Sequence, residues 1–256
     1  MRAPGKAVRD TTWLKSRPVA HRGLHDVDAG IAENTLTAFR RAIAAGMPFE
    51  IDVRLSKDGE AIVFHDEVLD RLTDQTGPIR HRTAEELRTI KVAGTGDHIP
   101  TLSEVLAMTA GRVPVLIEIK APTRKVGRLE ARVAEILRGY DGAFAIQSFN
   151  PLVVDWFRRN EPDMIRGLLA CAYNDTGNFK MRRRARFTLR HMLCAPMIRP
   201  HFIAYDVNAL PAVAPRIARW FGLPLLAWTV ASEQQRKIGA QHADNIIFEG
   251  FVPGAV

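Results

Sequence analysis

Charged and titratable residues stand at the ends of short apolar runs, where buried strands would normally carry plain apolar side chains. The runs are 19–23 (Val-Ala-His-Arg-Gly), 49–53 (Phe-Glu-Ile-Asp-Val), 62–66 (Ile-Val-Phe-His-Asp) and 116–120 (Leu-Ile-Glu-Ile-Lys). A buried carboxylate is costly unless it is paired or binds a metal. Glu50, Asp52 and Glu118 together therefore point to a cation site.

Strand alternation places these carboxylates on common faces. Residues i and i+2 of a strand share a face, so Glu50 points the same way as Asp52, and Glu118 the same way as Lys120. Such oxygen ligands suit Mg2+ or Ca2+, with Mn2+ as a third candidate, better than Zn2+. The alternative is an ion-pair network with Arg and Lys partners, but three carboxylates near two strand-end histidines favour a divalent metal.

A tight hairpin is predicted between Asp52 and His65, because Asp58-Gly59 lies between two apolar stretches. A two-residue turn centred there pairs Val53 with Phe64 and places Asp52 opposite His65. Directly opposed residues share a sheet face, so this register brings His65 to the carboxylates.

His21 and His65 are the candidate proton-transfer groups. A lone strand-end histidine is more often a hydrogen-bonded structural residue. However, Arg22 and Gly23 follow His21, and they supply a guanidinium suited to phosphate and a backbone that permits close approach. Phosphoryl transfer needs one proton removed and one donated, and histidine titrates near neutral pH.

Taken together, these motifs resemble the glycerophosphodiester phosphodiesterase family over about residues 18 to 250. The matching stretches are His21-Arg22-Gly23, Glu33-Asn34-Thr35, Glu50-Ile51-Asp52-Val53, His65-Asp66, 99–104 (Ile-Pro-Thr-Leu-Ser-Glu), Glu118-Ile119-Lys120 and, more weakly, Gln147-Ser148-Phe149 and Trp228-Thr229.

The resemblance implies metal-dependent hydrolysis of a glycerophosphodiester to sn-glycerol 3-phosphate and an alcohol, with attack by water or by a substrate hydroxyl. By similarity, Glu50, Asp52 and Glu118 bind the divalent cation, and His21 and His65 are general acid and base. The resemblance also implies substrate-binding residues, with phosphate contacts from the first two: Arg22, Lys120, Glu33 and Trp228.

Two departures from the family pattern fall late in the chain. The family often reads Asp-Gly-Ile-Ile-Thr-Asp where residues 244–249 read Asp-Asn-Ile-Ile-Phe-Glu, and Ala231 replaces an Asn of many relatives. We expect these changes to affect which alcohol is accepted, not the metal chemistry.

Strands alternating with helices predict parallel βα units and, with the resemblance, an α/β fold of the (β/α)8 TIM-barrel type. A doubly wound open sheet is the alternative. We predict a basic tail over 1–17 and one barrel domain over 18–256, with a small capping insertion at about 66–100 after the third strand. The predicted strands are 18–21, 49–54, 61–65, 114–119, 143–148, 164–169, 202–206, 224–229 and 244–248. The predicted helices are 34–45, 83–90, 102–110, 126–138, 150–159, 210–221 and 232–240.

Bulk composition is that of an ordinary globular protein. Of 256 residues, 46% are hydrophobic and 25% charged, which supplies ample material for a core. The only cysteines, Cys171 and Cys194, read as reduced, packed thiols. The sequence contains neither an apolar leader nor a run of eighteen apolar residues, so a cytoplasmic location is expected.

Residues 176–205 form a basic segment without a single acidic residue. Its seven Lys and Arg residues account for most of the +8 net charge, and apolar residues are interleaved with them. We predict either a solvated helix whose apolar side packs on the barrel or weak contact of 179–193 with an anionic membrane surface. Nucleic-acid binding would rest on charge alone and is not predicted.

The alternatives to a soluble phosphodiesterase are a lysophospholipase D-type enzyme acting on membrane-derived lysophospholipids and a phosphodiester-binding protein without turnover. The basic segment favours the first. The complete set of histidines, carboxylates and Lys120 argues against the second. The oligomeric state is open, because no surface pattern identifies an interface.

Overall fold

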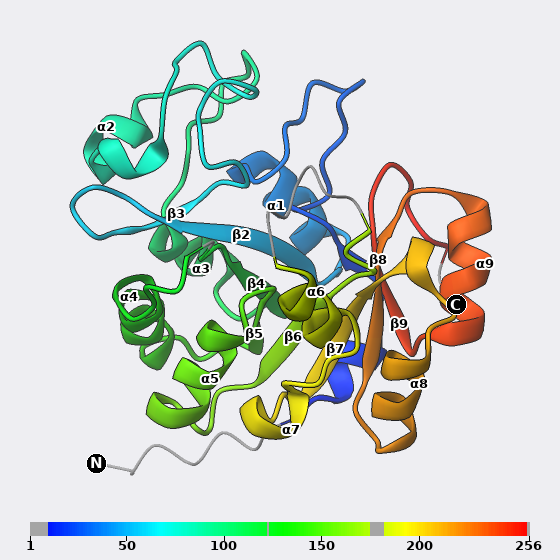
Figure 1. Ribbon diagram of the computed structural model, residues 1–256. Helices are drawn as coiled ribbons and strands as arrows, with labels where there is room; N and C mark the ends of the chain where they lie inside the picture. Colours follow the sequence, from blue (N-terminus) through cyan, green and yellow to red (C-terminus); the bar gives the residue numbers. More distant parts are fainter. Residues whose placement is uncertain (1–9, 122, 175–181, 255–256) are drawn as a thin grey trace, which may run out of the picture.

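Eight parallel strands close into a barrel in the computed structural model, which describes residues 10–121, 123–174 and 182–254 (Figure 1). The sheet runs β1-β9-β8-β7-β6-β5-β4-β2-β3, and pairing of β1 with β2 closes the ring. This confirms the predicted TIM barrel. The strands are β1 (Val19–Ala20), β2 (Phe49–Leu55), β3 (Ala61–Val63), β4 (Val115–Ile119), β5 (Phe144–Ser148), β6 (Arg166–Ala170), β7 (Phe202–Asp206), β8 (Leu225–Val230) and β9 (Asn245–Phe248).

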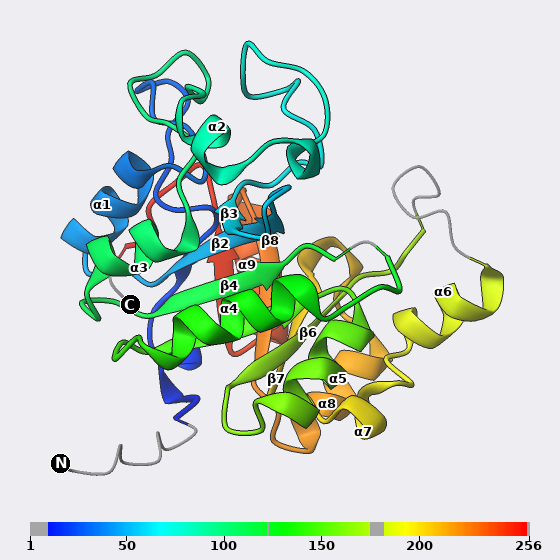
Figure 2. The same ribbon diagram turned by 90° about the vertical axis from the view of Figure 1, so that its left-hand side faces the viewer.

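Helices cover the outside of the ring, and their apolar faces pack against the strands to form the main core (Figures 1 and 2). Hydroxyl caps start α1, α3 and α9, where Thr35, Thr101 and Ser232 each accept a backbone N–H three residues on. The helices are α1 (Leu36–Ala44), α2 (Ala84–Arg88), α3 (Leu102–Thr109), α4 (Arg128–Arg138), α5 (Pro151–Asn160), α6 (Arg183–Arg190), α7 (Ala195–Ile198), α8 (Val213–Trp220) and α9 (Glu233–His242).

β3 lies outside the ring as the antiparallel partner of β2, which explains the ninth predicted strand. The predicted register was wrong by one residue, because Val53 pairs with Val63 and Leu55 with Ala61. The cause is a three-residue loop: Ser56 N–H donates to Glu60 O at 3.0 Å, and Gly59 takes φ +94°. The pairing continues one residue beyond β3, since Phe64 N–H donates to Asp52 O at 2.9 Å, and His65 follows directly and still lies close enough to act on Asp52.

The region after β3 forms the predicted capping insertion and has its own small apolar core, which includes Leu69, Ile79 and Leu87. The insertion carries the 3-10 turn η2 (Ile79–His81) and α2, and Figure 2 shows it above β2 and β3.

Part of the predicted tail belongs to the barrel. Residues 1–9 lie outside the described residues, but the 3-10 turn η1 (Thr12–Lys15) buries Trp13 and Leu14 against the apolar cluster inside the ring. Among the described residues, no helix has the length and apolar character needed to cross a bilayer.

Helix α6 lies in the basic segment 176–205, where a solvated helix was one of the two predictions, and it has no fully buried residue. Helix α7 was not among the predicted helices. Cys171 and Cys194 are free thiols, as expected.

Candidate active site

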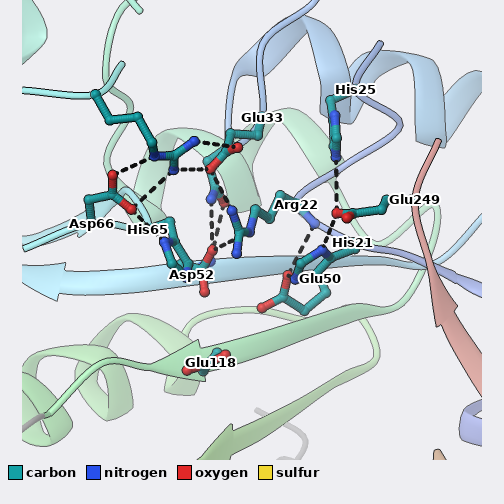
Figure 3. Close-up of polar contacts among 12 residues, drawn as sticks. His21, Arg22, His25, Glu33, Glu50, Asp52, His65, Asp66, Glu118 and Glu249 are labelled. Carbon is teal, nitrogen blue, oxygen red and sulfur yellow. Dashed lines mark hydrogen bonds and ion pairs between the residues drawn. The ribbon is translucent and has the colours of Figure 1, made fainter. Parts of the chain in front are cut away.

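Three buried carboxylates from two neighbouring strands meet at the carboxyl ends of the strands (Figure 3). Glu50 and Asp52 share a face of β2, and the parallel register pairs Asp52 with Glu118 on β4. One oxygen of each carboxylate lies within 4.8 Å of the others, and the three residues are only 0–6% exposed. The grouping predicted from strand alternation is therefore present.

Burial acts on the ionisation of this cluster. Burial, reinforced by the neighbouring carboxylates, raises the pKa of Glu50 well above its usual range, and burial also raises the pKa of Glu118. Burial opposes ionisation of Asp52 too, but Lys120 and then Arg22 outweigh it and hold the pKa of Asp52 below its ordinary value. Asp52 is therefore the member that stays ionised most readily.

The donor set fits a hard divalent cation. Lys120 Nζ lies 3.0 Å from Asp52 Oδ1 and 2.6 Å from Glu118 Oε1, so one ammonium serves two carboxylates. Glu50 Oε1 is buried and accepts no hydrogen bond from any described residue. A buried carboxylate oxygen without a donor is costly, and coordination of Mg2+ or Ca2+ would remove that cost.

Arg22 and Asn34 hold the other side of Asp52. Asn34 Nδ2 donates to Asp52 Oδ2 at 2.8 Å, and the Asp52 N–H donates to Asn34 Oδ1 at 3.2 Å. Arg22 Nε lies 3.4 Å from Asp52 Oδ2, and Arg22 Nη1 donates to Glu33 Oε1 at 2.7 Å. The backbone N–H of Arg22 donates to Glu50 Oε2 at 3.1 Å. Arg22 is thereby tied to the cluster by both its side chain and its backbone.

Each histidine has a carboxylate on its Nδ1 atom. His21, directly after β1, places Nδ1 2.7 Å from Glu249 Oε2, and its Nε2 lies 4.0 Å from Glu50 Oε2. His65 places Nδ1 2.6 Å from Asp66 Oδ1. A carboxylate at Nδ1 favours the tautomer with a proton there, which leaves Nε2 as the basic atom.

Burial lowers the pKa of both imidazoles. The pKa of His65 falls to about 4, mainly through burial, with further lowering by Lys120 and Arg22. Burial also lowers the pKa of His21, although the hydrogen bond with Glu249 acts in the opposite direction. Both rings are therefore poised to accept a proton in their neutral form at neutral pH.

Arg71 from the capping insertion joins two parts of the site. Its Nε and Nη2 donate to the two oxygens of Asp66 at 2.6 and 3.0 Å. Its Nη2 and Nη1 donate to the two oxygens of Glu33 at 2.8 and 3.1 Å. Since Asp66 holds His65 and Glu33 holds Arg22, one guanidinium connects the partners of both side chains.

Trp228 is the one predicted site residue that makes no polar contact with this network among the described residues. It lies on β8 and packs edge-on against Phe149, with ring centroids 5.3 Å apart. Its indole Nε1 is buried and finds no hydrogen-bond partner in the described part of the chain.

Five residues of the network were not predicted as site residues: Asn34, Asp66, Arg71, Glu249 and His25, whose Nε2 lies 3.7 Å from Glu249 Oε2 (Figure 3). Asn34 and Asp66 lie in stretches that match the family, next to the predicted site residues Glu33 and His65, so the sequence could have indicated them. Glu249 directly follows β9, and its departure from the family pattern was expected to concern only the alcohol. The structure places its carboxylate against His21, and the expectation about the alcohol stays a prediction. Arg71 lies outside the short motifs that resemble the family, so the sequence did not indicate it as a site residue.

Comparisons with known proteins agree on one family. The sequence model of the glycerophosphoryl diester phosphodiesterase family matches residues 21–248. A glycerophosphodiester phosphodiesterase from Caldanaerobacter subterraneus subsp. tengcongensis is 32% identical over 184 residues, which cover 67% of this chain and 74% of the relative. Glycerophosphodiester phosphodiesterase 1 from Homo sapiens is 30% identical over 181 residues, covering 64% of this chain and 53% of that protein.

Solved structures show the same fold. A glycerophosphodiester phosphodiesterase from Thermotoga maritima superposes with a TM-score of 0.69 at 28% identity, covering 90% of this chain and 92% of that one. A phosphodiesterase from Oleispira antarctica, solved in complex with the product sn-glycerol-3-phosphate, gives a TM-score of 0.74 at 22% identity, with coverage of 92% and 93%.

Proposed function

The chain belongs to the glycerophosphoryl diester phosphodiesterase family, and from this premise we propose that it hydrolyses glycerophosphodiesters to sn-glycerol 3-phosphate and an alcohol. The observation that carries the proposal is the buried carboxylate cluster flanked by two histidine–carboxylate pairs. The named relatives support this substrate class, and the product bound to the Oleispira antarctica protein supports the glycerol phosphate half.

Glu50, Asp52 and Glu118 would hold the divalent cation, for which Mg2+, Ca2+ and Mn2+ are the candidates. When bound, the cation would polarise the phosphoryl oxygens and offset the negative charge that develops on them. The orphaned Glu50 oxygen supports this assignment.

His21 and His65 would divide the proton transfers. A phosphorus–oxygen bond forms to water or to a substrate hydroxyl, and one Nε2 accepts the proton released. The bond from phosphorus to the alcohol oxygen breaks, and the other ring, in its imidazolium form with a proton on Nε2, donates that proton to the alcohol. Its lowered pKa makes this imidazolium a stronger acid than an ordinary one. Glu249 and Asp66 keep the two rings oriented for these roles.

Arg22 and Lys120 would contact the phosphate, since both cations already lie against Asp52. Glu33 would act on the glycerol or metal region through Arg22. Trp228, packed against Phe149, would supply an apolar wall for the substrate.

A lysophospholipid is a second candidate substrate, and exposed basic side chains of α6, which lies within the predicted membrane-contacting segment 179–193, favour it. Residues 179–181 of that segment lie outside the described residues. The names of the relatives favour the water-soluble substrate. The intact site disfavours a binding protein without turnover. A cytoplasmic location stays a prediction from the sequence.

The proposal is tested by release of glycerol 3-phosphate from glycerophosphocholine and glycerophosphoethanolamine. We expect no release with EDTA and restored release on addition of Mg2+, Ca2+ or Mn2+. Release that is insensitive to EDTA would overturn the metal assignment. Absence of release with every metal, together with turnover of a micellar lysophospholipid, would favour the second candidate.

Arg71→Gln is expected to lower kcat/KM by about 10- to 100-fold, the usual cost of losing a partner that orients a site group. The matched control is Arg80→Gln, which breaks an ion pair of the same insertion, with Glu67, away from the site. Steady-state kinetics with both variants check the prediction. Equal kcat/KM values for the two would show that Arg71 does not orient the catalytic groups.

A further inference from the structure

Exposed large apolar side chains are concentrated in the part of the chain that carries α6, α7 and α8. Eleven such side chains are exposed in the described part of the chain, and seven of them lie between residues 187 and 221. We name this set, together with the arginines among them, the basic apolar face. Its apolar members are Phe187, Leu193, Met197, Val213, Ile217, Trp220 and Phe221.

Helix α8 is apolar on both sides, in contrast to an ordinary barrel helix. Its small residues Ala214 and Ala218 pack against the core. Its large residues point outward instead, and Trp220 and the adjoining Phe221 are 82% and 74% exposed. Several large exposed apolar side chains in one part of a protein surface point to an interaction site.

Helix α6 adds positive charge to this surface. The expected packing of its apolar side on the barrel is present only in part, since Leu189 packs against the core whereas Phe187 is 59% exposed and no residue of α6 is fully buried. Figure 2 shows α6 standing away from the barrel. None of the arginines on or beside α6 and α7 pairs with a carboxylate among the described residues. They are Arg182, Arg183, Arg184, Arg186, Arg190 and Arg199.

Strand order brings these helices together. β6, β7 and β8 are consecutive in the ring, so the connection carrying α6 and α7 lies next to the one carrying α8 (Figure 1). Arg216, exposed on α8 between Val213 and Trp220, continues the positive charge across the surface.

We propose that the basic apolar face docks on the surface of a bilayer containing anionic lipids. Arginine heads would meet lipid phosphates while the aromatic rings enter the headgroup boundary, as interfacial helices do. Residues 176–205 contain basic but no acidic side chains, so no carboxylate of this segment would repel an anionic lipid. The face thereby extends the predicted contact of 179–193 to α7 and α8.

Two other occupants fit less well. A two-fold dimer would place this arginine-rich surface against a copy of itself, so like charges would repel. A nucleic acid would use the arginines but would leave Trp220, Phe221 and Met197 without a matching surface.

Docking would keep the enzyme near phosphodiesters released from lipids, and only this consequence rests on the proposed function. Binding itself is measured without turnover, so failure of docking and failure of the proposed activity are separate results.

The test is sedimentation with vesicles of phosphatidylcholine alone or mixed with phosphatidylglycerol, using the full chain. We expect binding only to the mixed vesicles, weakened by salt. Arg183→Gln/Arg186→Gln should weaken it about 30-fold, from about fivefold per basic residue at an anionic surface. Trp220→Ser/Phe221→Ser should weaken it about tenfold or more and abolish a vesicle-induced blue shift of tryptophan fluorescence.

Arg80→Gln/Arg88→Gln removes the same net charge from the capping insertion and is expected to bind as the unaltered chain does. All three double variants should retain kcat/KM on glycerophosphocholine. The proposal is overturned if the unaltered chain ignores anionic vesicles or if the control loses as much binding as the arginine variant. It is equally overturned if the chain is a dimer that Trp220→Ser/Phe221→Ser converts to a monomer.

Discussion

His65→Ala and His21→Ala are each expected to lower kcat by a factor of about 10² to 10⁴, the usual loss when a positioned proton-transfer group is removed. Each ring is held at Nδ1 by its own carboxylate, Asp66 or Glu249, so neither histidine can take over the other's position. The measurement is glycerol 3-phosphate release with the proposed metal at saturation, in an assay that detects a 10⁴-fold loss.

The matched control is His81→Ala, at the end of η2 in the capping insertion, which should keep full activity. Metal binding should persist in both site variants, because Glu50, Asp52 and Glu118 are unchanged. Activity within a few fold of the unaltered enzyme in either variant would remove that histidine from the mechanism. Loss of metal binding as well would mean that the ring helps hold the metal site.

Glu50→Gln is expected to raise the metal concentration needed for activity by about 100-fold or more. Loss of a residue that only hydrogen-bonds to a metal ligand costs about 10- to 100-fold in metal affinity, and loss of a ligand itself should cost more. The substitution removes one of three clustered charges without changing the shape of the side chain. Burial and the neighbouring carboxylates already raise the pKa of Glu50, so the metal-free variant should be at least as stable as the unaltered chain.

The second measurement for this variant is the change in Tm with added metal. A ligand at 100 times its Kd stabilises the folded state by about 2.7 kcal/mol, so the unaltered chain should gain a clear increase in Tm. Glu50→Gln should gain none at the same concentration. Glu60→Gln, which breaks a surface ion pair with Arg132, should respond to metal as the unaltered chain does. An unchanged metal requirement in Glu50→Gln would show that Glu50 is not a ligand.

The barrel and the centre of its site could be predicted because the signals are local. Two-residue alternation placed Glu50 and Asp52 on one face of β2, and the recurring apolar runs located every strand of the ring. The predicted helices 34–45 and 232–240 likewise begin within two residues of α1 and α9, whose hydroxyl caps depend only on neighbouring residues.

The register of the β2–β3 hairpin could not be predicted from the local sequence. Asp58-Gly59 correctly indicated the turn, but a two-residue and a three-residue loop use the same pair and differ by one position in register. The backbone hydrogen bond of Ser56 to Glu60 selected the longer loop. The one-residue shift pairs Asp52 with Phe64 instead of His65, and His65 is the next residue along the chain.

The amino-acid sequence by itself determined which residues could bind a metal and transfer protons, and on which strands they stand. Only the tertiary structure decided which groups orient them, because Glu249 and His21 are 228 positions apart and meet through closure of the ring between β1 and β9. The tertiary structure also decided that the large side chains of α8 face outward, because its small residues Ala214 and Ala218 pack against the core. Residue type and spacing are properties of the chain, whereas long-range partners and the choice between two apolar helix faces depend on packing.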